Sequence, residues 1–335
     1  MRKALIALLI VVGLISCENQ KSFKINVNFN NSTGKTVYLQ RYDKQEINTI
    51  DSVLVENNKA VFELQKSDNT DAFQIMMNGW RRPLVFFADN KNVTIKGDYQ
   101  NYNGIKVEAS ESQKKLNRLM EDVNKMENDD EIYKYVKCFV EENIDNPIGV
   151  YALYRYKWAF QFDDIYKFYI SFPKDMQSGY KYEIGQYAKG LERTSVGQPF
   201  LNFKQSDING DTFYFNDVVG KSKIVILDFW ASWCPDCRKA NPELVALYKE
   251  FKDKGLDIVS VSLDTDSEAW KNAIEKDSLM WNNHVSDLKG WNNEVAQIYT
   301  IAYIPQTFVI DENGMILEKN VPFDKLQYII SDNLK

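Results

Sequence analysis

Histidine is nearly absent from this chain of 335 residues, which contains one histidine and four cysteines. A Cys/His nucleophilic pair would require the single histidine, His284, to fold beside a cysteine. One histidine also provides too few ligands for a structural zinc site. A dense Lys/Arg patch is also lacking, and the net charge of −6 argues against a nucleic-acid partner. We expect no metal and no nucleic acid, and we expect His284 to lie at the surface or in a strand.

The composition is that of a folded, globular protein. Hydrophobic residues make up 44% of the chain and charged residues 26%, so extensive disorder is not expected. The length allows two or three domains.

The first residues have the features of a targeting segment. Arg2 and Lys3 precede an apolar stretch from Ala4 to Ile15 that is too short to span a bilayer comfortably. The tetrapeptide Leu-Ile-Ser-Cys that ends at Cys17 resembles the bacterial lipoprotein processing box, which implies that Cys17 is lipidated. The alternative is a secretory signal with an incidental cysteine. We expect residues 1–17 to be this signal and lipobox, and the remainder to be a membrane-anchored protein of the cell envelope, facing the periplasm or the surface.

Two regions without an obvious chemical motif follow. Strict alternation of apolar and polar residues from Phe23 to Phe29 predicts a half-buried strand, and further short strands lead us to expect an antiparallel β domain over residues 18–108. Apolar residues then recur at helical spacing, so residues 109–193 are predicted to be a helical segment with Asn146 as a helix cap. Cys138 falls in this segment and is interpreted as a lone, partly buried small apolar residue.

Residues 194–335 alternate between strand and helix signals. The apolar run from Ile224 to Trp230 is typical of a central strand, and a helix is predicted to begin at Pro235. The chain closes with a predicted hairpin and a final helix. This order indicates an α/β domain with a mixed sheet and helices on both faces.

The strongest chemical signal is the pentapeptide Trp233-Cys234-Pro235-Asp236-Cys237. Two thiols one helical turn apart suit exchange with a foreign disulfide, because one sulfur attacks and the other releases the product. A cysteine at a helix N-terminus favours the reactive thiolate, and Pro235 suits the first turn because its missing N–H has no partner there. Taken alone, the motif also permits zinc binding or a structural disulfide.

Neighbouring residues strengthen the redox interpretation. Asp228 lies in the apolar strand, where burial should raise the pKa of its carboxyl group and let it exchange a proton with Cys237; a purely structural carboxylate is the alternative. Ile304-Pro305 is a candidate cis peptide whose backbone would pair with an extended substrate, and a trans edge proline is the alternative. Trp233 would form an apolar rim beside the nucleophile or simply pack.

These residues together carry a family resemblance. Asp228-Phe-Trp-Ala-Ser-Trp-Cys-Pro-Asp-Cys237, then Pro242, then Ile304-Pro305-Gln-Thr-Phe-Val-Ile-Asp311 resembles the thioredoxin superfamily, and in particular its extracytoplasmic TlpA/ResA-type thiol:disulfide oxidoreductases. The resemblance covers residues 196–335 and implies a thioredoxin-like fold. Residues 20–190 resemble, more weakly, the β-plus-helical region that precedes such domains in lipoproteins of the Bacteroidetes.

The resemblance assigns roles to the matching positions. It implies that Cys234 attacks, that Cys237 resolves and forms a disulfide with Cys234, that Asp228 is the buried acid, and that Pro305 is the cis proline. Trp233, Pro235, Asp236 and Ile304 are expected to contact the substrate.

Three features differ from the family pattern. Many ResA-like proteins have a glutamate where this chain has Ala240, and many have asparagine in place of Asp228. Asp236 adds a negative charge that either complements the helix dipole or disfavours the thiolate, which would make the couple more reducing.

We therefore expect a protein-disulfide reductase for exported proteins that needs no separate cofactor, because the dithiol is the redox group, and that is recharged by a membrane thiol carrier. Disulfide oxidase or isomerase action is the alternative within the class. A thiol peroxidase of the AhpC/TSA type needs proline and threonine where Leu227 and Ala231 stand. A binding lipoprotein with a non-catalytic domain of this fold is the remaining alternative.

Overall fold

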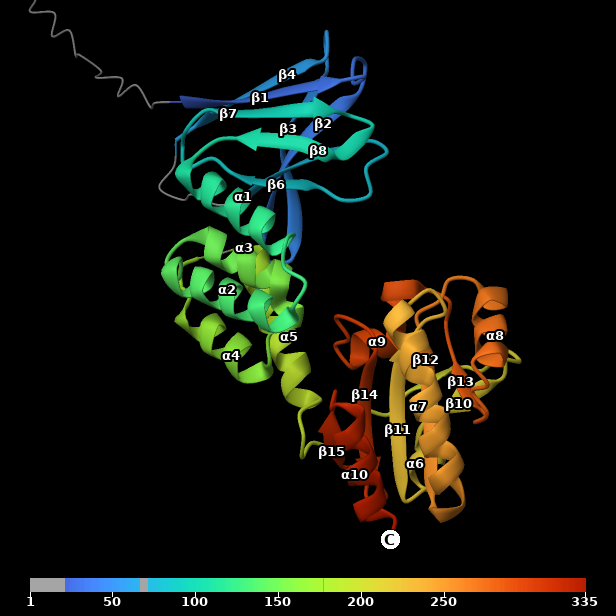
Figure 1. Cartoon of the computed structure of the whole chain (residues 1–335). Coiled ribbons are helices and arrows are strands. Elements are labelled where there is room, and N and C mark those ends of the chain that lie inside the picture. Colours follow the sequence, from blue (N-terminus) through green and yellow to red (C-terminus); the bar gives the residue numbers. More distant parts are fainter. Residues whose placement is uncertain (1–21, 67–71, 177) are drawn as a thin grey trace, which may run out of the picture. The chain divides into compact units, whose positions relative to one another are not determined.

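The computed structural model describes residues 22–66, 72–176 and 178–335. The expected targeting segment and Cys17 lie outside these ranges. The chain divides into two compact units, one ending at Met120 and the other running from Glu121 to Lys335 (Figure 1). None of the helices in the described ranges has both the length and the apolarity required to cross a membrane.

The described part of the first unit contains two four-stranded sheets, with strand orders β4-β1-β7-β8 and β3-β2-β5-β6. Their strands are β1 (Ser22–Asn30), β2 (Thr36–Asp43), β3 (Glu46–Leu54), β4 (Lys59–Gln65), β5 (Ala72–Met77), β6 (Leu84–Phe87), β7 (Val93–Asp98) and β8 (Asn101–Glu108). Side chains of both sheets share one apolar core, to which the alternating residues of β1 contribute Phe23 and Ile25. α1 (Glu111–Val123) follows β8 in the chain.

Strand direction in the first unit is mainly antiparallel, as expected, with one exception. β1 and β7 run parallel, with Ile25 paired to Val93 and Phe29 to Gly97. Parallel neighbours need a long connection, and the chain provides one because it builds the whole second sheet between these two strands. The alternating pattern of each strand carries no information about this direction.

The second unit begins with helices. They are α2 (Asp129–Glu142), α3 (Pro147–Tyr156), the short 3₁₀ helix η1 (Lys157–Ala159), α4 (Phe162–Ser171) and α5 (Gly179–Arg193). The side chain of Asn146 accepts a hydrogen bond from the backbone N–H of Ile148, so Asn146 caps α3 as predicted.

Cys138 in α2 is exposed, so the expectation that it is partly buried was wrong. The buried stripe of α2 consists of Ile132, Val136 and Val140 at four-residue spacing. Cys138 lies two residues from the nearest of these, which rotates it away from the stripe and toward solvent.

The remainder of the second unit is a thioredoxin-like domain around a five-stranded sheet with the order β13-β12-β11-β14-β15. Its elements are β9 (Lys204–Ser206), β10 (Thr212–Tyr214), α6 (Asn216–Val219), β11 (Ile224–Trp230), α7 (Pro235–Phe251), η2 (Lys252–Lys254), β12 (Leu256–Ser262), α8 (Ser267–Lys276), β13 (Asn283–Val285), η3 (Gly290–Asn292), α9 (Glu294–Ile298), β14 (Gln306–Asp311), β15 (Ile316–Lys319) and α10 (Phe323–Asn333).

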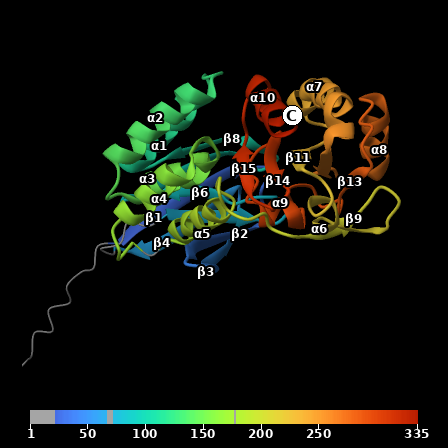
Figure 2. The same cartoon turned by 90° about the horizontal axis from the view of Figure 1, so that it is seen from below.

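The sheet is mixed, which confirms the predicted fold class. β13, β12 and β11 are parallel, whereas β14 is antiparallel to both of its neighbours. α7 packs beside α10 on one face and α9 lies on the other (Figure 2). Because β11 has strands on both sides and helices over both faces, all of its residues are buried, which fixes the backbone that leads into Cys234.

Candidate active site

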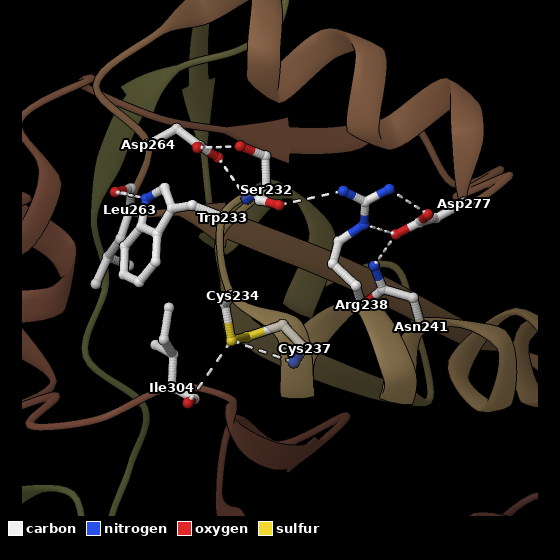
Figure 3. Close-up of a disulfide and its surroundings, with 10 residues drawn as sticks. All are labelled: Ser232, Trp233, Cys234, Cys237, Arg238, Asn241, Leu263, Asp264, Asp277 and Ile304. Carbon is white, nitrogen blue, oxygen red and sulfur yellow. Dashed lines mark hydrogen bonds and ion pairs between the residues drawn. A yellow bond between two sulfur atoms is a disulfide. The ribbon is translucent and has the colours of Figure 1, made fainter.

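The two cysteines of the motif lie where β11 leads into α7 (Figure 3). Cys234 is the N-cap residue of α7, and its Sγ accepts a hydrogen bond from the backbone N–H of Cys237 at 3.1 Å. A disulfide joins Cys234 to Cys237, with their Cα atoms 5.3 Å apart. Pro235 is the first helical residue, where the loss of one N–H removes no helical hydrogen bond. The structure therefore presents an oxidised dithiol at a helix N-terminus.

This position makes the two sulfurs unequal. Unpaired N–H groups and the helix dipole stabilise negative charge at the cap, and hence a Cys234 thiolate after reduction. Cys234 is 5% exposed and Cys237 is 1% exposed, so an incoming sulfur reaches Cys234 more easily. The same surface at the first turn of α7 includes the exposed residues Pro235 and Asp236.

Asp228 occupies the middle of β11 and is 2% exposed. Burial raises the pKa of its carboxyl group from 3.8 to about 7, and a hydrogen bond from the Ser260 hydroxyl opposes the rise. That hydroxyl donates to Asp228 Oδ2 at 3.0 Å, and the indole N–H of Trp281 donates to Ser260 Oγ at 3.1 Å. The predicted rise in pKa is present, and the group can gain or lose a proton near neutral pH.

The loop before Cys234 is held by a buried carboxylate. Ser232 donates its backbone N–H to Asp264 Oδ2 at 2.9 Å and its hydroxyl to Oδ1 at 2.5 Å. Ser262 donates a further hydrogen bond to Asp264 at 2.7 Å. Asp264 is 1% exposed, so these hydrogen bonds compensate for the removal of its charge from water.

An arginine ties the same loop to α7 and α8. Arg238 donates to the Ser232 carbonyl at 3.1 Å and contacts both carboxylate oxygens of Asp277, through Nε and, at 2.6 Å, through Nη2. Asn241 donates to Asp277 at 2.7 Å. Burial opposes ionisation of Asp277, but the hydrogen bonds from Arg238 and Asn241 hold its pKa below the ordinary value. Figure 3 shows these side chains beside the disulfide.

The segment between α9 and β14 approaches the disulfide from another side. The Ile304–Pro305 peptide bond is cis, as predicted. The carbonyl oxygen of Ile304 lies 3.8 Å from Cys234 Sγ, and this is a contact without a hydrogen bond because the sulfur is closed as a disulfide. The backbone before the cis proline therefore lies next to Cys234 Sγ.

Two exposed tryptophans, Trp233 and Trp291, lie against each other beside the motif. Trp233 is 51% exposed and Trp291 is 46% exposed, with ring centroids 6.2 Å apart. The indole N–H of Trp233 donates to the Leu263 carbonyl at 3.3 Å, which fixes the orientation of the ring. The two rings form an apolar surface beside Cys234, and Trp291 was not anticipated.

His284, by contrast, serves the core. It lies in β13, is 3% exposed, and its Nε2 is 3.2 Å from the Leu279 carbonyl. Burial lowers the pKa of its imidazole to about 4. It stacks on Trp281, so it supports the residue that hydrogen-bonds to Ser260. Within residues 22–66, 72–176 and 178–335, no three His, Cys, Asp or Glu side chains gather as metal ligands would.

Family models match two parts of the chain. Residues 196–319 match the AhpC/TSA family, and residues 23–116 match a domain of unknown function (DUF4369).

Curated relatives match the thioredoxin-like domain. The chain is 31% identical over 128 residues to a thiol-disulfide oxidoreductase ResA of Bacillus cereus, which covers 38% of this chain and 70% of that protein. It is 30% identical over 129 residues to ResA of Bacillus subtilis, covering 38% of this chain and 69% of that protein.

Solved structures resemble the same domain. The thioredoxin domain of a thiol-disulfide oxidoreductase from Bacteroides vulgatus is 34% identical, with a TM-score of 0.39, and the match covers 42% of this chain and 99% of that one. A thiol-disulfide oxidoreductase from Bacteroides fragilis is 32% identical, with a TM-score of 0.38, and the match covers 40% of this chain and 98% of that one.

Proposed function

Because the chain belongs to the ResA-type thiol-disulfide oxidoreductases of the thioredoxin superfamily, we propose that it reduces disulfides of exported proteins through Cys234 and Cys237. The observation that carries the proposal is the Cys234–Cys237 disulfide at the N-terminus of α7, with Cys234 as the cap residue. A helix cap promotes the thiolate, and a second thiol one turn away allows the product to leave.

The reaction begins with the reduced protein. Cys234 thiolate attacks one sulfur of the substrate disulfide, so a Cys234–substrate disulfide forms and the other substrate sulfur leaves as a thiolate that takes a proton. Cys237 then attacks Cys234 Sγ, which forms the Cys234–Cys237 disulfide and releases the second substrate sulfur. The substrate gains two electrons from the dithiol and two protons. One proton comes from the Cys237 thiol and the other from water, because Cys234 enters the reaction as a thiolate.

Asp228 is the proposed proton acceptor for the second step. Cys237 must lose its proton before it attacks, and a carboxyl group with a pKa of about 7 can accept a proton near neutral pH. The polypeptide substrate would lie along Ile304 and Pro305 and contact Trp233, Pro235 and Asp236. The 3.8 Å approach of Ile304 to Cys234 and the exposure of the three other residues support these proposed contacts.

The reduced protein must be regenerated by a dithiol, and we assign that task to a thiol carrier in the membrane. The Leu-Ile-Ser-Cys sequence supports lipidation at Cys17 and hence a location on the outer side of the cytoplasmic membrane. Acyl chains would keep the dithiol close to such a carrier.

The match to the AhpC/TSA family suggests peroxide reduction as an alternative function. That chemistry needs a threonine hydroxyl three residues before the attacking cysteine, and Ala231 occupies this position with no exposed surface. Leu227, which is also fully buried, replaces the proline of that motif. The site therefore lacks the hydroxyl and the proline that the peroxidase motif requires.

Insulin reduction by dithiothreitol tests the proposal. The full chain in detergent should accelerate precipitation of the insulin B chain, and Cys234→Ser should abolish the acceleration. Cys138→Ser is the matched control because it removes the exposed free thiol and should leave the rate unchanged. A wild-type rate equal to that of Cys234→Ser would indicate a non-catalytic domain.

The reduction potential of the Cys234/Cys237 couple decides the direction. A value near or below about −250 mV supports a reductase, whereas one near about −120 mV supports an oxidase. Peroxide consumption by the reduced protein, with Cys237→Ser as control, distinguishes a peroxidase from a thiol-disulfide oxidoreductase.

A further inference from the structure

A cavity of about 620 Å³ lies within the second unit, between the helices that precede the thioredoxin-like domain and the loop after α9. One side is formed by residues of α3, η1 and α5, which include Arg155, Lys157 and Arg193. The other side is formed by the end of α9 and by residues 300–302. The cavity is separate from the disulfide, and nothing in the proposed exchange reaction uses it.

The lining of this cavity has a positive balance of charge. It contains three basic side chains and one carboxylate, that of Glu183, in a chain whose net charge is −6. In the part of the chain that the structure describes, none of the three basic side chains forms a salt bridge. An anionic group that entered would gain attraction without first breaking an ion pair.

Lys157 is held in place before any ligand arrives. Its ammonium group lies over the rings of Tyr154 and Tyr187, at 4.6 and 5.1 Å from their centroids. Burial lowers the pKa of Lys157, and the charge of Glu183 only partly opposes this. A carboxylate from outside would offset the cost of this partial desolvation.

The loop that lines one side of the cavity runs on in the chain to the residues beside the disulfide. Residues 300–302 lead directly to Ile304, whose carbonyl oxygen is 3.8 Å from Cys234 Sγ. Two residues span at most about 7 Å of backbone, so the edge of the cavity lies within reach of a polypeptide bound at Cys234. With the 3.8 Å from Ile304 to the sulfur added, the path is about 11 Å, which an extended substrate covers with about three residues.

We propose that this cavity binds a carboxylate of the disulfide substrate, so that disulfides with an acidic group a few residues from the attacked sulfur are preferred. The inference rests on the proposed exchange reaction and names a class of substrate for it. A polypeptide substrate supplies the group as Asp or Glu, and a small disulfide such as glutathione disulfide supplies it as a free carboxylate.

Matched peptide disulfides test the preference. The full chain is reduced in detergent, freed of reductant and mixed without oxygen with disulfide-linked dimers of a glycine-rich peptide that has one cysteine and, three residues away, Glu, Gln or Lys. Acid-quenched samples give the second-order rate constant. We expect the Glu peptide to react about fivefold faster than the Gln peptide at low salt, the scale of one or two exposed ion pairs, and the Lys peptide to react more slowly than both.

Charge-neutral variants locate the effect. With Arg155→Gln/Lys157→Gln, the rate constants for the Glu and Gln peptides should differ by no more than about twofold. The rate constant for the Gln peptide should stay at its wild-type value, which also shows that the variant is folded. Lys249→Gln/Lys252→Gln removes the same charge from the C-terminal end of α7 and the start of η2, about 22 Å or more from Cys234, and should preserve the preference. Salt at 0.5 M should weaken the preference in the wild type.

The outcomes separate this inference from the proposed function. If all peptides are reduced equally by the wild type, or if the control pair loses the preference as fully as the cavity pair, the cavity does not select substrates. If no peptide is reduced faster than by Cys234→Ser, the exchange reaction itself is wrong. A cavity-dependent rate with glutathione disulfide but not with the Glu peptide would support carboxylate binding and assign it to small disulfides.

Discussion

Replacing Asp228 with asparagine should make the thioredoxin-like domain markedly more stable at alkaline pH. Asp228 is buried in the middle of β11, and its single described hydrogen-bond donor is the Ser260 hydroxyl. Asparagine keeps the shape of the side chain and an oxygen that can accept that hydrogen bond, but it never carries a charge. The substitution therefore isolates the free energy of burying the ionised carboxylate.

The magnitude follows from the pKa of Asp228, which burial raises from 3.8 to about 7. Between these two values the unfolded chain has lost the proton of Asp228 while the folded domain keeps it. The wild type therefore loses stability as the pH rises through this window, at about 1.4 kcal/mol per pH unit. The penalty is complete above pH ~7. Relative to the wild type, Asp228→Asn should gain about 3 kcal/mol between pH 5 and pH 8.

Hydrogen–deuterium exchange of the β11 amides measures this difference in stability locally, in the unit that contains Asp228. The opening free energy of residues 224–230 is determined at pH 5 and pH 8, after correction for the intrinsic exchange rate at each pH. The protein is kept oxidised, so that Cys234 and Cys237 do not titrate. Comparing the two pH values cancels any constant loss from the altered hydrogen bond to Ser260.

A change of less than about 1 kcal/mol in the stability difference between variant and wild type over this range would contradict a raised pKa for Asp228. Glu250→Gln, an exposed position on α7, is the control and should show no comparable change. If Asp228→Asn were instead equally destabilising at both pH values, the carboxylate would be a structural hydrogen-bonding group with no proton to exchange near pH 7.

Two further predictions concern Arg238, beside the disulfide, and Cys138, in α2. Arg238→Gln should lower the free energy of unfolding by about 2 kcal/mol in the same exchange experiment, because it breaks the paired hydrogen bonds to Asp277, whereas Lys239→Gln should not. Cys138 should react with iodoacetamide more slowly than free cysteine at pH 7.5, since the charge of Glu142 raises the pKa of its thiol; Glu142→Gln should speed the reaction, and an unchanged rate would contradict this cause.

The sequence predicted the part of the site that is local in the chain. The apolar run of β11, the capping position of Cys234 and the proline in the first helical turn are specified within a dozen residues, so they can be recognised without tertiary information. Ile304–Pro305 was found by its motif, although its 3.8 Å approach to Cys234 depends on the completed sheet.

The residues that hold this local element in place were not predicted. Ser260 contacts Asp228 because β12 pairs with β11 in the register that sets these two residues opposite each other. Asp277 meets Arg238 across 39 positions of sequence because α8 ends beside α7. The only signals in the sequence were the polar residues Asp257, Ser260 and Ser262 among the apolar residues of β12, and each of them has many possible partners.

Three buried or half-buried carboxylates surround the candidate site, and their hydrogen bonds divide them by role. Asp264 accepts three hydrogen bonds from Ser232 and Ser262, and Asp277 accepts three from Arg238 and Asn241. A carboxylate with that many donors would lose several of them on protonation, so both are suited to fixing the loop.

Asp228 differs because, among the described residues, it accepts a hydrogen bond only from the Ser260 hydroxyl. A hydroxyl can donate to the carboxylate or accept from the protonated acid, so Asp228 can change its protonation state without leaving a buried group unpaired. The surroundings of each carboxylate therefore support the proposal that Asp228 is the proton-exchanging acid. If Asp264→Asn changed the pH dependence of exchange as Asp228→Asn does, this division of roles would be wrong.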